Sequence, residues 1–371
     1  LGLEDAVPNH SSFSKNRHGR FRDADLLRMV FDTVVKRCIE EELVKGEGFA
    51  IDASFIRADV SRQRAEHSPV DWTPAKTESR AVQDYLAELD QNETLQRTQK
   101  SVSLTDPMAQ WSGAKGPAEF YYSTNYMIDI ENNIILDVEA SPSTHRLEVQ
   151  TTRTMIDRIE SNHGISPKRL MGDTAYGAAD NLGYLVDEKN IEPHVPVWDK
   201  SKRKDNTFSS GDFIWEVDDD EYRCPEGKLL RRRTRQYKHI KTAITKANTI
   251  IYRSKVADCK DCPLKNKCCP NTTHRKIARS IHEAARDVAR AINETDEYKH
   301  KSFHERKKVE MMFAHMKRNH NFIRLRLRGI KSANDEFLMV AAAQNLKRLA
   351  RLCGQPPPGR GVTAPAIPKM A

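Results

Sequence analysis

The sequence predicts an α/β protein in which a mixed sheet is flanked by helices and carries an inserted, cysteine-containing module. Helical periodicity alternates with short apolar runs along most of the 371 residues, as it does where helices cover a sheet. From about residue 198 to residue 275 this alternation is replaced by Lys, Arg, Asp and Cys, which indicates a separate module. These two patterns together predict the fold class.

The individual elements follow from the apolar pattern in chain order. A first amphipathic helix ends before Gly46, whose lack of a side chain suits a helix end. The apolar run 48–56 contains one carboxylate, Asp52, and predicts a buried strand that keeps a polar group for a reason. A polar excursion at 60–116 includes a helix near 78–89. The further predicted elements are strands at 119–128 and 134–140 joined as a hairpin, a helix at 147–159, a strand at 169–173, a helix at 181–189, a strand at 191–197, and helices at 280–318 and 335–352.

We expect four regions along the chain. They are a helical lead-in at 1–47, a core formed by 48–197 and 276–352, the basic cysteine-containing insertion at 198–275, and a disordered proline-rich tail at 353–371. The chain begins at Leu1 without an initiator methionine or a signal peptide, so we expect residues to be missing upstream.

Composition argues against two classes of protein. No apolar run approaches the roughly 18 residues that a membrane-spanning helix needs, so we expect no bilayer crossing. Seven cysteines are too few for a secreted disulfide scaffold, and four of them lie between Cys259 and Cys269, which indicates metal binding and a reducing cytoplasm. The formal charge of +9 favours nucleic acid as a partner, because basic proteins attract phosphate.

Two acidic residues stand at the ends of predicted strands. Asp52 and Asp173 are far apart in the sequence, but a mixed sheet can bring both to one edge. Such a pair suits two hard cations. Phosphodiester chemistry uses one metal to activate the attacking oxygen and a second to take charge from the leaving oxygen, and Mg²⁺ prefers carboxylate ligands. Taken singly, each Asp has a simpler interpretation as a turn or capping residue.

A third acid is expected on a later helix. At about 100° per residue, Arg306 and Lys317 both fall within about 40° of Glu310, and Phe303 falls in the same stripe. A helix that faces a metal site on DNA needs this mixture, because the acid holds metal while the cations meet phosphate. The alternatives are an ordinary surface helix with an i,i+4 Arg–Glu pair and Asp106 as the third acid.

The pattern F-x2-R-x3-E-x6-K that starts at Phe303 resembles the Y-x2-R-x3-E-x6-K signature of DDE transposases from bacterial insertion sequences, with Phe in place of Tyr. Around Asp52 the letters I-D-A-S resemble the first-Asp strand of that family, and around Asp173 the letters G-D-T-A-Y resemble its second-Asp turn. The letters T-D-P-M-A at 105–109 resemble its D-P-D-A box, with Met108 in place of the second Asp.

This resemblance covers about residues 4–352 and implies a ribonuclease-H-like core in which Asp52, Asp173 and Glu310 hold two Mg²⁺ or Mn²⁺ ions. It implies a transposase that cleaves DNA at insertion-sequence ends and transfers the freed strand to target DNA. The implied partners are double-stranded DNA, both at the transposon ends and at the target, and a second copy of the chain in a homodimer. The implied location is the bacterial cytoplasm, near the nucleoid. The missing upstream residues would then include a DNA-binding part. The rival hypotheses are a non-catalytic DNA-binding remnant and a metal-dependent nuclease that does not join strands.

The cysteines of the insertion are spaced as two knuckle-like turns. The letters C-P-E-G start at Cys224, and C-x2-C-P-x4-C starts at Cys259. Four thiolates arranged in this way form a closed, structural Zn²⁺ site, and the element resembles one found in a branch of the same transposases. Cys269 competes for the fourth position, and free reduced thiols are the alternative. The predicted Zn²⁺ ligands are Cys224, Cys259, Cys262 and Cys268.

Basic residues gather in two stretches. Residues 228–255 hold ten Lys or Arg and no acid, and residues 301–351 hold thirteen Lys or Arg and four acids, or 13 − 4 = +9. We predict phosphate contacts from both stretches. The alternatives are a solvated face for the first stretch and an exposed basic edge for the alternating segment 324–328. The predicted phosphate-binding residues are Arg306, Lys317, Arg324, Arg326, Arg328, Arg231, Arg232 and Arg233.

Overall fold

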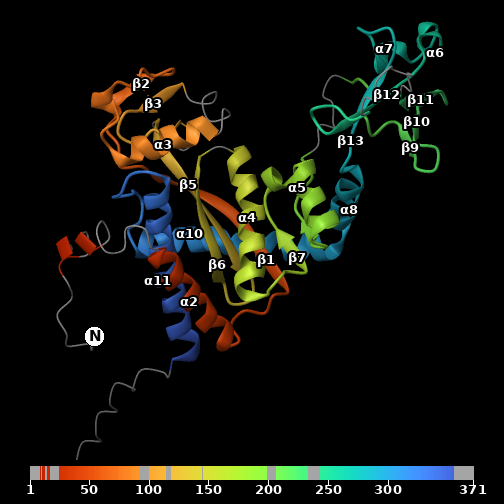
Figure 1. Cartoon of the computed structure of the whole chain (residues 1–371). Coiled ribbons are helices and arrows are strands. Elements are labelled where there is room, and N and C mark those ends of the chain that lie inside the picture. Colours follow the sequence, from red (N-terminus) through yellow and green to blue (C-terminus); the bar gives the residue numbers. More distant parts are fainter. Residues whose placement is uncertain are drawn as a thin grey trace, which may run out of the picture. The chain divides into compact units, whose positions relative to one another are not determined.

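The computed structural model describes residues 9, 11–12, 15–16, 25–91, 100–113, 118–143, 145–198, 206–232 and 243–354. The chain divides into two compact units, Leu1–Pro167 with Lys307–Ala371 and Lys168–Arg306. Helices accompany strands that pair both antiparallel and parallel, which confirms the mixed α/β class (Figure 1). The boundaries of these two units fall at other residues than the boundaries of the four expected regions. The expected boundaries stay a prediction.

An antiparallel sheet forms the centre of the first unit. Its strands are β1 (Gly48–Arg57), β4 (Gln110–Ser112), β5 (Glu119–Asp129) and β6 (Ile134–Pro142). Strand β5 pairs with β1 on one side and with β4 and β6 on the other. Strands β5 and β6 form the predicted hairpin. Every residue of β5 after Glu119 is buried, as in a strand whose two faces are both covered.

Helices hold this sheet through buried polar contacts as well as apolar packing. They are α2 (Leu26–Glu40), α4 (His145–His163), α10 (Lys307–Asn319) and α11 (Ile330–Cys353). Asn345 of α11 accepts the main-chain N–H of Ile135 at 2.8 Å and donates to its carbonyl at 2.7 Å. Arg28 of α2 and Arg158 of α4 both donate to Asp137 of β6, a carboxylate that is 1% exposed. These contacts fix α2, α4 and α11 on β6.

The polar excursion of the first unit contains short elements. They are β2 (Ala65–His67), α3 (Arg80–Gln91), β3 (Ser101–Ser103) and 3₁₀ turns at Arg62–Arg64 and Pro74–Lys76. Strands β2 and β3 pair antiparallel, and the ring of Trp72 lies 5.8 Å from that of Tyr85 on α3. The helix expected in this region is therefore confirmed.

The second unit starts with a parallel strand pair. Strand β7 (Arg169–Met171) pairs with β8 (Glu192–His194). The connection between them consists of a 3₁₀ turn at Thr174–Gly177, α5 (Ala179–Gly183) and a π-helical turn at Tyr184–Glu188. The later helical elements of this unit are α8 (Glu283–Glu294), a π-helical turn at Tyr298–Ser302 and α9 (Phe303–Glu305).

A five-stranded antiparallel sheet lies between β8 and α8 in the sequence of the second unit (Figure 1). Its strands are β9 (Ile214–Glu216), β10 (Glu221–Arg223), β11 (Leu229–Arg232), β12 (Thr249–Arg253) and β13 (Lys276–Ser280), and the helices α6 (Val256–Lys260) and α7 (Lys265–Cys268) lie between β12 and β13 in sequence. We call residues 206–280 the cysteine module. Its aromatic core includes Trp215, Tyr222 and Tyr252, whose ring centroids lie 4.7 to 5.5 Å apart.

Several elements differ from expectation. The helix expected over 280–318 is divided among α8, the π-helical turn, α9 and α10. The alternating segment 324–328 forms no strand, and an isolated bridge joins Arg324 to Arg57 of β1. Residues 355–371 of the expected tail lie outside the described residues. Among the residues that are described, none of the helices has the length and apolar character that a bilayer crossing demands.

Candidate active site

Asp52 lies on the face of β1 that α10 covers. Directly paired residues of antiparallel strands share a face, and Asp52 pairs with Tyr126 of β5. The Tyr126 ring lies 4.9 Å from the ring of Phe313 on α10, and its hydroxyl lies 3.4 Å from the sulfur of Met316. Asp52 is half-buried, and its Oδ1 accepts the Ala53 N–H at 2.8 Å. A carboxylate therefore faces the interface between strand and helix.

Lys317 joins α10 to the same face of the strand. Ser54 is two residues from Asp52 and so points in the same direction. The Ser54 hydroxyl accepts from Lys317 Nζ at 2.8 Å. Glu310 stands about two helical turns before Lys317, so the two side chains share one edge of α10. The structure thus brings Lys317 to the strand that carries Asp52 and aligns the exposed Glu310 with the same helix edge.

Asp173 belongs to the second unit, where it follows β7. Its Oδ1 accepts the Ala175 N–H at 2.8 Å and caps the 3₁₀ turn Thr174–Gly177. This is the capping role that the simpler interpretation gave it. The side chain is half-buried, and a capping carboxylate keeps a second oxygen with lone pairs for another partner. Capping and metal binding are therefore compatible at this residue.

A buried polar network joins β7 to the helical segment that precedes α10 in sequence. Arg169 of β7 donates to Glu305 at 2.8 Å and 3.3 Å, and to the Ser302 hydroxyl at 2.9 Å. Glu305 is only 8% exposed. The two partners of Arg169 lie more than 130 residues away, and no local pattern in the sequence marks such a pair. The sequence marks this pair only by placing Arg169 in a predicted strand and Glu305 on the side of a predicted helix opposite Glu310.

His194 of β8 completes this network. Its Nδ1 lies 2.7 Å from the Ser302 hydroxyl. Burial lowers the pKa of His194 below its usual value, so the imidazole is neutral at pH 7. The Ser302 hydroxyl contacts both Arg169, from which it accepts, and His194 Nδ1. The network is satisfied internally and acts as an anchor for the segment that leads to Glu310.

Phe303 and Arg306 form a stacked pair at the end of the second unit. The guanidinium carbon of Arg306 lies 5.4 Å from the Phe303 ring centroid, within the range of a cation–π contact. The Phe303 side chain is 42% exposed. The ring at this first position of the F-x2-R-x3-E-x6-K pattern therefore supports the arginine, although it lacks the hydroxyl of a tyrosine.

The arginines of segment 324–328 pair with one acid. Arg324 and Arg328 contact the two oxygens of Asp59 at 2.9 Å and 3.1 Å, and both side chains remain about half exposed. The main-chain N–H of Arg326 donates to Glu336 at 2.9 Å. The main chain of this segment is thus held by hydrogen bonds, while its guanidinium groups reach solvent. Exposed guanidinium groups remain able to contact phosphate.

The first basic stretch is partly neutralised. Arg231 pairs with Glu221, and Arg232 pairs with Asp220 at 3.0 Å. Both arginines are exposed. Arg233 lies outside the described residues. Each of these two arginines has an acidic partner, as Arg324 and Arg328 also have, and their assignment as phosphate-binding residues stays a prediction.

Asp106 has a structural role rather than the place of a third acid. It is fully buried, accepts the Tyr122 hydroxyl at 2.6 Å and accepts the N–H of Gly329 at 2.9 Å. Gly329 is the N-cap residue of α11. Burial raises the pKa of Asp106 to about 6. Asp106 therefore orders the start of α11.

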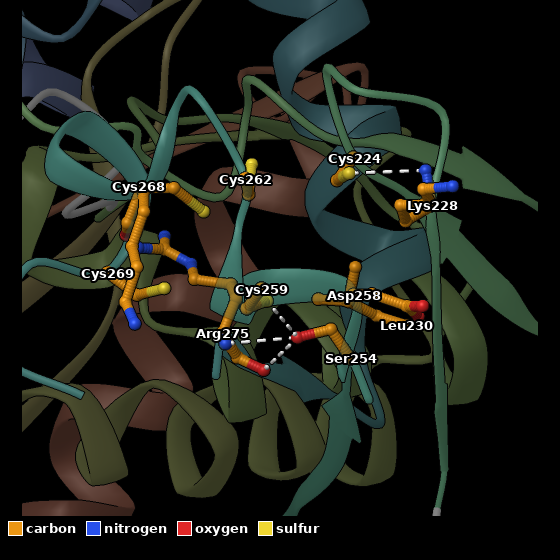
Figure 2. A pocket seen from close by; sticks show the side chains of 11 residues that line it. Cys224, Lys228, Leu230, Ser254, Asp258, Cys259, Cys262, Cys268, Cys269 and Arg275 are labelled. Atoms are coloured by element: carbon orange, nitrogen blue, oxygen red, sulfur yellow. Dashed lines mark hydrogen bonds between the residues drawn. The ribbon is translucent and has the colours of Figure 1, made fainter. Parts of the chain in front are cut away.

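Five cysteines line one small cavity of the cysteine module (Figure 2). They are Cys224, Cys259, Cys262, Cys268 and Cys269, and all are free thiols. The volume of about 20 Å³ is room for one water molecule or ion. Burial raises the pKa of Cys268 to about 12 and also raises that of Cys269, so burial alone favours their neutral form. The cavity gathers all four predicted Zn²⁺ ligands and their competitor.

Three acids of the cysteine module lie close enough together to share a metal ion. The ligand atoms of Glu216, Asp219 and Glu221 lie within 4.8 Å of one another, and no other trio of His, Cys, Asp or Glu among the described residues does so. Arg223 donates to both oxygens of Glu216, at 2.6 Å and 3.0 Å, and Arg231 pairs with Glu221. These arginines supply the positive charge, so the group is accounted for as ion pairs.

Comparison with known proteins gives one match. Residues 223–350 match the family described as a transposase DDE domain. The matched range includes the five cysteines of the cavity, Glu310 and Lys317, while Asp52 and Asp173 precede it. Such a domain implies DNA binding and DNA processing in transposition. No curated protein matches the chain.

Proposed function

We propose that the chain is a DDE transposase that cleaves DNA at the ends of a bacterial insertion sequence and joins the freed strand to target DNA. The observation that carries the proposal is the seating of α10 on β1. The helix that bears Glu310 and Lys317 lies in the range matching a transposase DDE domain, and Lys317 reaches the strand face that bears Asp52. A carboxylate and a cation, both needed for phosphodiester chemistry, thus share one face of β1.

The donor set fits hard divalent cations. Asp52, Glu310 and, by the resemblance, Asp173 would hold two Mg²⁺ or Mn²⁺ ions, since all three offer carboxylate oxygens and none is deeply buried. When bound, such ions activate the attacking oxygen and take charge from the leaving oxygen. Within this chain, the Ala53 N–H holds one Asp52 oxygen at 2.8 Å and so limits rotation of the carboxylate.

Cations of the chain neutralise the DNA backbone beside the acids. Lys317 donates to the Ser54 hydroxyl at 2.8 Å and shares a helix edge with Glu310, so it would offer positive charge to a scissile phosphate. Arg306, stacked on Phe303, and the exposed Arg324, Arg326 and Arg328 would contact flanking phosphates. A homodimer on paired ends, acting on double-stranded DNA in the bacterial cytoplasm, is part of the same proposal.

The test uses the full-length protein with terminal DNA of the insertion sequence that encodes it and Mg²⁺. We expect 3′-end cleavage and strand-transfer products that disappear in Asp52→Asn, Asp173→Asn and Glu310→Gln. Glu294→Gln is the matched control, because Glu294 is an exposed acid of α8 that pairs with Lys299. Cleavage without joining would favour a nuclease. Tight DNA binding with no metal-dependent product would favour a non-catalytic remnant.

A further inference from the structure

Among its described residues, the cysteine module has a small apolar core. Its buried core consists of Phe213, Tyr222, Leu230, Tyr252, Ile277 and the three cysteines Cys259, Cys268 and Cys269. The strands that enclose this core are only three to five residues long. Small domains with few apolar residues usually need disulfides or a structural metal. The cysteines are free thiols, which leaves a metal as the missing cross-link.

The turn at Cys224 is shaped as a metal knuckle. Cys224 N–H donates to the Lys228 carbonyl at 2.8 Å, and Gly227 N–H donates to the Cys224 carbonyl at 2.8 Å. Gly227 has φ +75°, a left-handed conformation that favours glycine. The turn points the Lys228 N–H at Cys224 Sγ, at 3.3 Å. A main-chain donor aimed at sulfur stabilises a thiolate, which is the form that binds metal.

The second pair of turns provides matching donors. Lys265 N–H donates to the Cys262 carbonyl at 3.1 Å, so a tight turn also follows the Cys-Pro step at 262. The Ser254 hydroxyl lies 3.1 Å from Cys259 Sγ, and its oxygen accepts the Arg275 N–H at 3.0 Å. The hydroxyl has two acceptors within reach, Cys259 Sγ at 3.1 Å and the Arg275 carbonyl at 3.4 Å, and a sulfur that carries negative charge is the stronger of the two. Cys259 therefore also has a donor suited to a thiolate.

Charge around the cavity suits a site with four thiolates. Lys228, Lys265, Arg275 and Asp258 line it together with the cysteines (Figure 2). Four thiolates around a divalent cation leave two negative charges, and the three cations offset these and the charge of Asp258. The Arg275 guanidinium is fixed by the carbonyls of Cys268 and Phe208, at 2.7 Å and 2.9 Å. The positive charge is thus held at the cavity wall.

We propose that this cavity binds one Zn²⁺ through Cys224, Cys259, Cys262 and Cys268, and that the metal stabilises the cysteine module. The metal would join the β10–β11 hairpin, which carries Cys224, to the α6–α7 segment between β12 and β13. Zinc–sulfur bonds of about 2.3 Å bring four sulfurs to about 3.8 Å from one another. No three of these thiols lie within 4.8 Å in the described residues, so binding draws the side chains inward.

The test measures zinc in full-length protein purified under reducing conditions. We expect one Zn²⁺ per chain, and visible bands typical of tetrahedral thiolate coordination when Co²⁺ replaces it. Cys224→Ser and Cys262→Ser should lose the metal. Cys269→Ser should keep it. Cys353→Ser is the matched control, because Cys353 is an exposed thiol on α11 outside the cavity.

A second measurement guards against variants that merely fail to fold. Chelation of the wild-type protein should raise hydrogen exchange in β9–β13, leave β1 and β5 protected, and be reversed by added Zn²⁺. Absence of stoichiometric zinc, or a disulfide within the cavity in the native protein, would overturn the proposal. Loss of metal in Cys269→Ser with retention in Cys268→Ser would overturn the ligand assignment. None of these readouts depends on DNA cleavage, so they stand apart from the test of the transposase proposal.

Discussion

The two antiparallel sheets of the molecule are stabilised in different ways. In the first unit, β5 is buried along nearly its whole length, and helices cover the sheet through long contacts such as Asn345 with Ile135. In the described part of the cysteine module, short charged strands surround a core of eight buried residues, three of which are cysteines. The comparison teaches that helices of its own unit cover the sheet that carries Asp52, whereas thiols make up part of the small core of the module.

The largest effect is expected in the first sheet. Phe49 of β1 is fully buried, and Phe49→Ala removes most of a large side chain from a closely packed interior. We expect a loss of about 4 kcal/mol in the free energy of unfolding. Urea unfolding followed by hydrogen exchange in β1 and β5 measures it. The loss in unfolding free energy caused by Phe49→Ala should be the same with and without a zinc chelator. If the chelator changed that loss strongly, the first sheet would depend on metal as the cysteine module is proposed to do.

Buried charge is the second feature of the first unit. Asp137 accepts from Arg28 and Arg158, and Asp137→Ala removes the buried carboxylate that both cations share, while Arg158 keeps Glu139 as a partner at 2.7 Å. We expect a loss of about 3 kcal/mol or more, because an uncompensated buried charge is costly. Replacing all three residues by apolar ones of similar volume should recover much of that stability. Equal losses in the single and triple variants would show that packing, and not charge, holds α2 and α4 on β6.

The pH dependence of stability sharpens the role of Asp106. Its folded pKa of about 6 lies above the ordinary aspartate value of 3.8, so the folded state holds the proton more tightly. The neutral carboxyl stabilises the fold fully below about pH 4, and this contribution, roughly 3 kcal/mol, is lost as the pH rises through 6. We expect the unfolding free energy of the wild type minus that of Asp106→Asn to fall between pH 4 and pH 6.5. A difference that does not vary with pH would contradict the burial argument.

The smallest effect is expected on the surface of the cysteine module. Arg232 pairs with Asp220 at 3.0 Å, and both side chains are more than 40% exposed. We expect Arg232→Ala to change unfolding free energy by less than about 0.5 kcal/mol, since exposed ion pairs contribute little. It should also lower DNA affinity less than Arg326→Ala, which fluorescence anisotropy at several salt concentrations would measure. A larger loss of DNA affinity in Arg232→Ala than in Arg326→Ala would identify Arg232 as a main phosphate contact.

The elements that position the candidate site follow from local sequence patterns. The apolar run around Asp52 is β1, and the spacing from Glu310 to Lys317 places both on one edge of α10. The resemblance to DDE transposases is supported over 223–350 by the family match. Helical period and motif spacing are local properties, so a single sequence contains them.

Other features depend on partners far away in the chain. The strands of the cysteine module are short and rich in charge, and the thiols that line its cavity come from segments far apart in the sequence. Likewise, the ion pair of Arg169 with Glu305 joins residues that no periodicity connects. Asp106 was an alternative third acid, and only its contacts with Tyr122 and Gly329 reveal a structural role. Contacts of this kind are not encoded in any local window.

The role of Glu310 as a metal-binding acid is tested most directly by separating DNA binding from DNA cleavage in one variant. Glu310 is exposed, so Glu310→Gln should leave the fold intact. We expect terminal DNA to bind with an affinity within about threefold of the wild type, while Mg²⁺-dependent 3′-end cleavage falls by a factor on the order of 10³ or more, because a two-metal reaction loses a metal ligand. Cleavage by Glu310→Gln at a rate close to that of the wild type would contradict the proposed active site.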